Sequence, residues 1–333
     1  MLVLFTVLIL LVILVNGWTD APNAIAGCVS TRSLSPAKAL ALAAVCNFAG
    51  AVGMAILHPA VARTLFEIVD FGENSADALP ALCAGLCAVI LWAVIAWRFG
   101  IPTSESHALI SGITGAALAR RMSLEAINLS QWKSVLIGLF VTTLPAFLLG
   151  LLFYKILLWI LKGCDRRRAI GYFMRAQCVS AAGNALLHGA QDSQKFMGVY
   201  MLGLSLYYAK SDAEPESIPL FIVLICAAVM TLGTMLGGAR IIKKVGCDMT
   251  ELDAAGGSAS DAASTVILAL CSLLGIPAST THSKACAIMG TGACKSGSMD
   301  YRIVGQMLAA WALTFPCCGA IGFLLSFLIS GAH

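Results

Sequence analysis

Two short segments combine a carboxylate with amides inside very apolar surroundings. The first, NGWTDAPNA (Asn16 to Ala24), follows the run LVLFTVLILLVILV, and the second, HGAQDSQKF (His188 to Phe196), aligns with it without gaps. An unpaired aspartate inside a membrane costs roughly 2.5–3.5 kcal/mol on insertion scales, and a bound cation would compensate this cost. Because hard cations such as sodium bind oxygen, both segments predict cation sites. The candidate cation ligands are Asn16, Thr19, Asp20, Gln191 and Asp192, with the side-chain oxygens of Asn23, Ser193 and Gln194 close by in the sequence.

The same segments are predicted to interrupt a helix. Pro22 removes a backbone donor and clashes with the preceding turn, and Gly17 permits the backbone to leave helical geometry. Irregular backbone within a membrane is tolerated where it lines a cavity or is buried in protein. The alternative is an interfacial loop in which Asp20 faces water or caps a helix. The matching Asp192 in the second segment favours the cation site.

A second pair of segments places hydroxyls and a histidine directly after a proline. GIPTSESHALISGITG (Gly100 to Gly115) and GIPASTTHSKACAIMG (Gly275 to Gly290) are identical at seven of sixteen positions, among them the Pro, the first Ser and the His. Proline suits the first turn of a helix, and the free amides of a helix N-terminus bind anions. Two such termini that face each other are predicted to hold one tetrahedral oxyanion. The candidate anion ligands are Thr103, Ser104, Ser106, His107, Ser279, Thr280, Thr281 and His282, together with Asn23, Gln194 and Lys195.

Several of these residues have more than one interpretation. The hydroxyls could be ordinary N-caps, but caps explain one hydroxyl for each helix and not several. His107 and His282 are expected to orient neighbouring groups first, and to bind the anion or a proton second. Glu105, which aligns with Thr280, is either a carboxylate stabilised at a helix start or a protonatable coupling site. Asp261 is a further candidate within an apolar run.

The composition requires a membrane protein to position these residues. Hydrophobic residues make up 59% of the 333-residue chain and charged residues 11%, and the mean hydropathy is +0.89. Soluble domains carry about 25% charged residues. Long Leu, Ala and Val runs of about 20 residues favour spanning helices over a β-barrel. The N-terminal run lacks a basic start and a small-residue cleavage site, so we interpret it as a spanning helix and not a signal peptide. Further spans are predicted at 36–57, 76–97, 132–161, 217–239, 255–275 and 303–330.

The two pairs of segments have the same order and nearly the same offset, which indicates a duplication. The predicted halves are 1–161 and 169–333, joined by the basic linker 162–168, which is expected in the cytoplasm. If each half crosses the membrane an odd number of times, the halves are inverted, an arrangement typical of secondary transporters. We therefore expect an all-α polytopic membrane protein with two inverted-topology repeats, broken helices and re-entrant helical hairpins.

Other classes of protein fit less well. A net charge of +4 is too small and too scattered for nucleic-acid binding, and most of the 13 cysteines lie in apolar runs without zinc-ligand spacing. The absence of a GxxxxGK[ST] motif argues against an ATP-driven pump. An intramembrane hydrolase built on Ser104 or Ser279 is a distant alternative, because a catalytic triad needs one nucleophile and here each element is duplicated. No enzyme activity and no cofactor apart from a coupling ion is expected.

The chain resembles the PiT family of inorganic phosphate transporters over nearly its full length. The motifs that carry the resemblance are HGAQDSQKFMG, IPTSESH and IPASTTH. The resemblance implies a multi-pass transporter of the cell membrane that imports phosphate by symport with sodium or a proton, and that is a homodimer. It places phosphate between the hairpins and cations near Asp20 and Asp192. A permease for sulfate or another tetrahedral oxyanion is the alternative. The asparagine that the family has before each aspartate is Thr19 and Gln191 here, and Glu105 replaces a hydroxyl or small residue, which changes the reach of these ligands.

Overall fold

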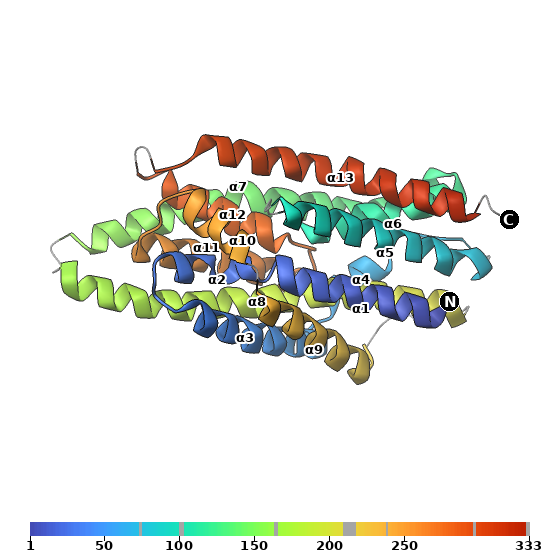
Figure 1. Ribbon diagram of the computed structural model, residues 1–333, viewed down its shortest axis with the longest axis horizontal. Helices are drawn as coiled ribbons and strands as arrows, with labels where there is room; N and C mark the ends of the chain where they lie inside the picture. The colour runs from blue at the N-terminus through green and yellow to red at the C-terminus, as the bar shows by residue number, and fades with distance from the viewer. Residues whose placement is uncertain are drawn as a thin grey trace.

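The computed structural model describes residues 1–72, 75–99, 103–162, 166–208, 218–237, 239–295 and 298–330. These residues are almost entirely helical, and the described part contains no strand beyond two isolated bridges. Most helices run along one long axis (Figure 1). The first half of the chain contains α1 (Leu2–Thr19), α2 (Pro22–Ser30), α3 (Pro36–Leu57), α4 (Ala60–Phe66), α5 (Ser75–Arg98), α6 (Glu105–Arg121), η1 (Leu124–Ala126) and α7 (Leu129–Ile160). The second half contains α8 (Arg166–Tyr208), α9 (Leu220–Leu236), α10 (Ala239–Lys243), η2 (Lys244–Asp248), α11 (Ala254–Leu273), α12 (Thr280–Gly292) and α13 (Tyr301–Ser330).

The predicted spans are confirmed as helices. Six described helical segments are long and apolar enough to cross a membrane, and a bent pair formed by α9 and the segment Ile241–Asp248 would make seven. The first of them, Leu2–Ser30, combines α1 and α2. Large apolar side chains such as Leu136, Phe140 and Leu144 on α7 are exposed. Outside a membrane these side chains would be in contact with water, so they indicate a lipid-facing surface. The chain is a multi-pass membrane protein.

The two halves run through the molecule in opposite directions. α1 begins at the end of the molecule where α13 finishes, whereas α7 finishes and α8 begins at the other end (Figure 1). Part of the predicted linker, residues 163–165, lies outside the described residues, and residues 166–168 belong to α8. The first half therefore starts and finishes at opposite ends of the long axis, and so does the second.

Each half packs its polar helices against the other half. The short helix α6 lies on α13, and the short helix α12 lies on α7. Likewise, α3 packs on α8, and α1 packs on α9. α6 and α12 are also in contact with the helix that precedes each of them, α5 and α11. Nearly every residue of α6 and all of α12 are buried. Two polar helices are thus held inside the molecule by long apolar helices of the opposite half.

Matched glycines allow this close packing. A Cβ atom added to Gly115 on α6 would lie 2.0 Å from the carbonyl oxygen of Gly319 on α13. A Cβ atom added to Gly290 on α12 would lie 2.0 Å from the carbonyl oxygen of Phe147 on α7. Neither carbonyl can move without displacing its helix, so only glycine fits at these two contacts. The glycines that close the two predicted hairpin motifs therefore set the distance between the halves.

We expect Gly115→Ala and Gly290→Ala each to lower the free energy of unfolding by about 1–3 kcal/mol, the usual cost of overpacking. Thermal unfolding of the detergent-purified protein measures this effect. The matched control is Gly53→Ala on α3, where an added Cβ meets no atom within 4 Å. The control should leave stability unchanged or raise it by up to about 1 kcal/mol, because alanine is the better helix former. Equal melting temperatures for all three variants would contradict the close contacts.

Candidate functional site

The first helix is interrupted at its aspartate, as predicted, but the second is not. α1 ends at Thr19 and α2 begins at Pro22, so Asp20 and Ala21 lie in the interruption. In contrast, α8 continues without a break through Asp192. The expected second break is therefore wrong. Gln194 occupies the position that aligns with Pro22, so nothing removes a backbone donor there.

Gly17 also has a different role from the one predicted. It lies inside α1 and is helical, so it does not release the backbone from helical geometry. A Cβ atom at this position would lie 2.3 Å from the carbonyl oxygen of Met230 on α9. Gly17 is required for helix packing, and the interruption of α1 follows from Pro22 alone.

The N-termini of α6 and α12 meet in the centre of the molecule. Ser104 is the N-cap of α6 and accepts a hydrogen bond from the amide of His107, while Ser279 caps α12 and accepts one from the amide of His282. The Ser279 hydroxyl donates to the Ser104 hydroxyl over 2.9 Å. Both serines are buried. Each serine is therefore an N-cap, and the two helix termini face each other. Gly100, Ile101 and Pro102, which begin the first motif, lie outside the described residues.

Asp20 lies beside this junction and has only neutral donors. Its Oδ2 accepts from the Glu105 amide at 3.4 Å and from Asn16 Nδ2 at 3.4 Å. The Glu105 side chain contacts the Thr19 hydroxyl through Oε1, and its Oε2 has no hydrogen-bond partner among the described residues. Neither Asp20 nor Glu105 forms an ion pair with a described Lys, Arg or His. Two fully buried carboxyl groups with surplus acceptor capacity make this a candidate cation site.

Asp192 has the opposite surroundings, because its carboxylate is paired with a buried ammonium group. Lys195 Nζ lies 2.7 Å from Asp192 Oδ1 and 2.7 Å from the Ser106 hydroxyl, and it also donates to the carbonyl oxygen of Ala278. Ser106 and Thr280 donate to the Asp192 carboxylate at 3.4 and 3.2 Å. Asp192 therefore connects α8 to the first turns of both α6 and α12.

Asn16 links the two aspartates. Its Nδ2 lies 3.4 Å from Asp20 Oδ2 and 3.3 Å from Asp192 Oδ2. His188, which aligns with Asn16 in the second half, places Nε2 3.4 Å from the same Asp192 oxygen. His188 is a residue of this centre that is not among the ligands predicted from the sequence. Its alignment with Asn16 was the signal that could have identified it.

The remaining predicted ligands are distributed around this centre. Asn23 Nδ2 donates to the Thr281 hydroxyl over 3.2 Å, which joins α2 to α12. Gln191 accepts from the Ala278 amide and donates to Ser272 and to the carbonyl oxygen of Ile276, so it fixes the segment before α12 and does not contact Asp20. Gln194 is directed elsewhere: its Oε1 accepts from the amides of Val61 and Ala62 in the first turn of α4.

The two predicted histidines pack against each other edge to face. The His107 and His282 ring centroids are 4.7 Å apart in an edge-on arrangement. His107 also packs on Phe315, and His282 packs on Trp311, both residues of α13. Among the described residues, neither ring forms a hydrogen bond with a serine hydroxyl, and the Ser279 hydroxyl donates to the Ser104 hydroxyl. This geometry fits orienting groups and provides no Ser–His nucleophile.

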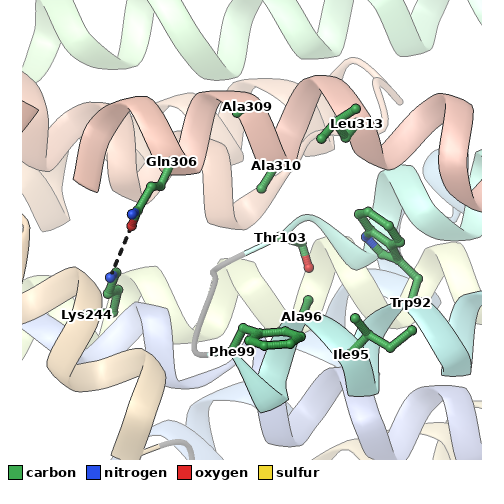
Figure 2. Close-up of a pocket in the computed structure, with 10 residues that line it drawn as sticks. All are labelled: Trp92, Ile95, Ala96, Phe99, Thr103, Lys244, Gln306, Ala309, Ala310 and Leu313. Atoms are coloured by element: carbon green, nitrogen blue, oxygen red, sulfur yellow. Dashed lines mark hydrogen bonds between the residues drawn. The ribbon is translucent and has the colours of Figure 1, made fainter. Parts of the chain in front are cut away.

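A cavity of about 570 Å³ adjoins the first hairpin on one side. Figure 2 shows Trp92 and Ile95 of α5, with Phe99 directly after this helix, on one wall, α13 on the other and Thr103 between them. Lys244 and Gln306 form a hydrogen bond of 3.4 Å at the border of the cavity. Thr103 is thus the predicted ligand that faces the cavity. The next residue, Ser104, is only 1% exposed, so the polar centre is closed from this side.

A second buried ion pair lies outside this centre. Lys284 on α12 pairs with Asp261 on α11, and both side chains are at most 1% exposed. Asp261 was a weaker candidate in the sequence, and the structure does not place it with Asp20 or Asp192. Its counter-charge is a structural partner, since a buried charge must be paired.

Buried hydroxyls, helix N-termini and carboxylates at the meeting point of two membrane-embedded halves define a membrane transport protein for small ions. Residues 16–322 match the phosphate transporter family, and the chain belongs to that family. It is 33% identical to a probable low-affinity inorganic phosphate transporter of Bacillus subtilis, over 99% of this chain and 98% of that protein. It is 35% identical to a protein of the same description from Rhizobium meliloti, over 94% of this chain and 91% of the relative.

The fold is also found in a solved structure. A sodium-dependent phosphate transporter superposes with a TM-score of 0.82 at 20% sequence identity, covering 100% of this chain and 99% of the other. At this identity the likeness establishes the fold. The relatives are transporters, which agrees with the expectation that the chain is not an enzyme.

Proposed function

We propose that the protein imports inorganic phosphate across the cell membrane by symport with a cation. The observation that carries the proposal is the junction of the α6 and α12 N-termini, where Ser104 and Ser279 are 2.9 Å apart and buried carboxyl groups lie alongside. Helix N-termini and hydroxyls bind oxyanions, and the carboxyl groups of Asp20 and Glu105 attract a cation. Phosphate is the substrate of the family. Sodium is the first candidate for the cation, with a proton on Glu105 as the alternative.

The proposed binding mode uses five of the predicted ligands. Phosphate would separate Ser104 from Ser279 and accept hydrogen bonds from both, while the cation would lie among Asp20, Asn16 and Thr19. The opposite directions of the two halves in Figure 1 support inverted repeats that meet at this site. The homodimer in the membrane that the family resemblance implies belongs to the proposal as well.

Uptake by proteoliposomes tests this function. Purified protein should accumulate radiolabelled phosphate when a sodium gradient is imposed, and a proton gradient imposed alone separates the two coupling ions. Excess unlabelled sulfate should not compete if phosphate is the substrate. Competition by sulfate at equal concentration would instead favour a general oxyanion permease, and no uptake under either gradient would contradict symport.

We expect Ser104→Gly and Ser279→Gly each to weaken phosphate binding about three- to tenfold, because a hydroxyl hydrogen bond contributes about 0.5–1.5 kcal/mol and more when the ligand is charged. Glycine is chosen because it is nearly as good an N-cap as serine, so stability should change little. The apparent KM and the melting temperature are measured on the same preparations. Asn128→Gly, which removes the side-chain cap of α7 far from the site, should leave KM unchanged. Unchanged KM in both serine variants would remove the hydroxyls from the anion site.

A further inference from the structure

Lys195 occupies a position that resembles a cation site. Its ammonium group contacts the Asp192 carboxylate, the Ser106 hydroxyl and the Ala278 carbonyl oxygen. Carboxylate and carbonyl oxygens are ligands that hard cations select in proteins, and the hydroxyl adds a third oxygen. An ammonium group has three donors and is a compact point charge. Its three donors match the three oxygen partners, and Lys195 is fully buried.

The first half has no equivalent charge. Asn23 aligns with Lys195, and it is a neutral amide that donates to Thr281. Asp20 aligns with Asp192, and its carboxylate accepts hydrogen bonds from neutral donors, among them Asn16 Nδ2 and the Glu105 amide. The two aspartates therefore occupy matched positions, but of the two only Asp192 forms an ion pair within the described residues.

We propose that the Lys195 ammonium group is a tethered replacement for one coupling cation, so that the second half needs no mobile cation and the first half does. This inference rests on the proposed symport function. A carboxylate buried at the site must be neutralised in every state in which it is closed from water. Lys195 neutralises Asp192 throughout the cycle because it belongs to the same helix. Only Asp20 and its neighbour Glu105 then require an ion that enters and leaves with phosphate.

The alternative role for Lys195 is direct binding of phosphate. The two roles differ in what a neutral substitute changes. If Lys195 is an anion ligand, its loss raises the KM for phosphate and leaves the cation-to-phosphate ratio as it was. If Lys195 replaces a cation, its loss opens a second cation site at Asp192 and raises that ratio by one.

The test compares Lys195→Asn, which reproduces the residue of the first half, with Lys195→Arg, which keeps the charge. Full-length proteins are reconstituted into proteoliposomes, and the reversal potential of phosphate flux under sodium and under proton gradients gives the charge moved for each phosphate. Dual-isotope uptake with sodium-22 and phosphorus-32 counts the sodium ions directly. We expect one additional cation for each phosphate in Lys195→Asn and no change in Lys195→Arg.

The matched control is Lys284→Asn, which removes the other fully buried lysine ion pair and lies outside the site. It should leave the ratio unchanged even if it lowers the amount of folded protein. An unchanged ratio in a transporting Lys195→Asn variant would overturn the inference. If Lys195→Asn folds but does not transport, the number of cations bound at equilibrium is measured in the presence of inorganic phosphate. Bound sodium is counted with sodium-22, and bound protons are counted from the dependence of the binding heat on the ionisation enthalpy of the buffer. One additional bound cation supports the inference, and an equal number overturns it. Failure of the wild-type protein to couple phosphate to any cation would instead contradict the proposed function.

Discussion

Asp20→Asn should abolish cation-coupled phosphate uptake while the protein remains folded. Asp20 lies in the interruption between α1 and α2, and it has no cationic partner among the described residues. A charged contact with the cation is worth about 3 kcal/mol, so its loss should lower coupled uptake by about 100-fold or more. Stability should not fall, because the substitution removes an uncompensated buried charge and asparagine keeps a similar shape.

The measurement combines uptake with thermal unfolding across a sodium titration. Ligands that bind only the folded state raise its melting temperature, so the wild-type protein should be stabilised by sodium and Asp20→Asn should not. Asp261→Asn, the same substitution in a buried carboxylate paired with Lys284, is the control. It should be less stable but should retain the response to sodium. A full sodium response in Asp20→Asn would remove Asp20 from the cation site.

Asp192→Asn should lose activity for a different reason, because it should also unfold more readily. Removing one partner of a buried ion pair leaves the other charge uncompensated and costs about 3–5 kcal/mol. Here the uncompensated charge is the Lys195 ammonium group. The hydrogen bonds from Ser106 and Thr280, which hold α6 and α12 to α8, are weakened as well.

A second substitution separates the ion pair from other roles of Asp192. The double variant Asp192→Asn with Lys195→Met removes both charges and keeps the lysine volume, so much of the lost stability should return. Thermal unfolding of the two single variants and the double variant gives the coupling between the residues. Equal stability of Asp192→Asn and wild type, or no recovery in the double variant, would contradict a structural ion pair.

The membrane spans and the two hairpin helices could be predicted from the sequence, because each depends on local composition. The run 36–57 coincides with α3, and the run 303–330 begins two residues after the start of α13 at Tyr301. The caps at Ser104 and Ser279 also follow from a local rule.

The partners across the site could not be predicted in the same way. Gln194 was expected to contact the anion, yet its amide oxygen accepts from the first turn of α4, more than a hundred residues away in the sequence. Gly17 is predicted from the sequence to let the backbone leave helical geometry, but in the structure it permits close contact between α1 and Met230 on α9. The aligned motif predicts a break in α8 like the one between α1 and α2. α8 is continuous because Gln194 lies at the position that aligns with Pro22. Such errors arise where tertiary contacts decide the role of a residue.

The reciprocal packing of α6 on α13 has a consequence for how the chain is made. α6 is synthesised well before α13, which is the helix of the opposite half that packs most extensively on it. The first hairpin therefore has its α13 partner only after nearly the whole second half has been synthesised. A chain that ends before Tyr301 would lack α13, so the face of α6 that packs on α13 would have no protein partner.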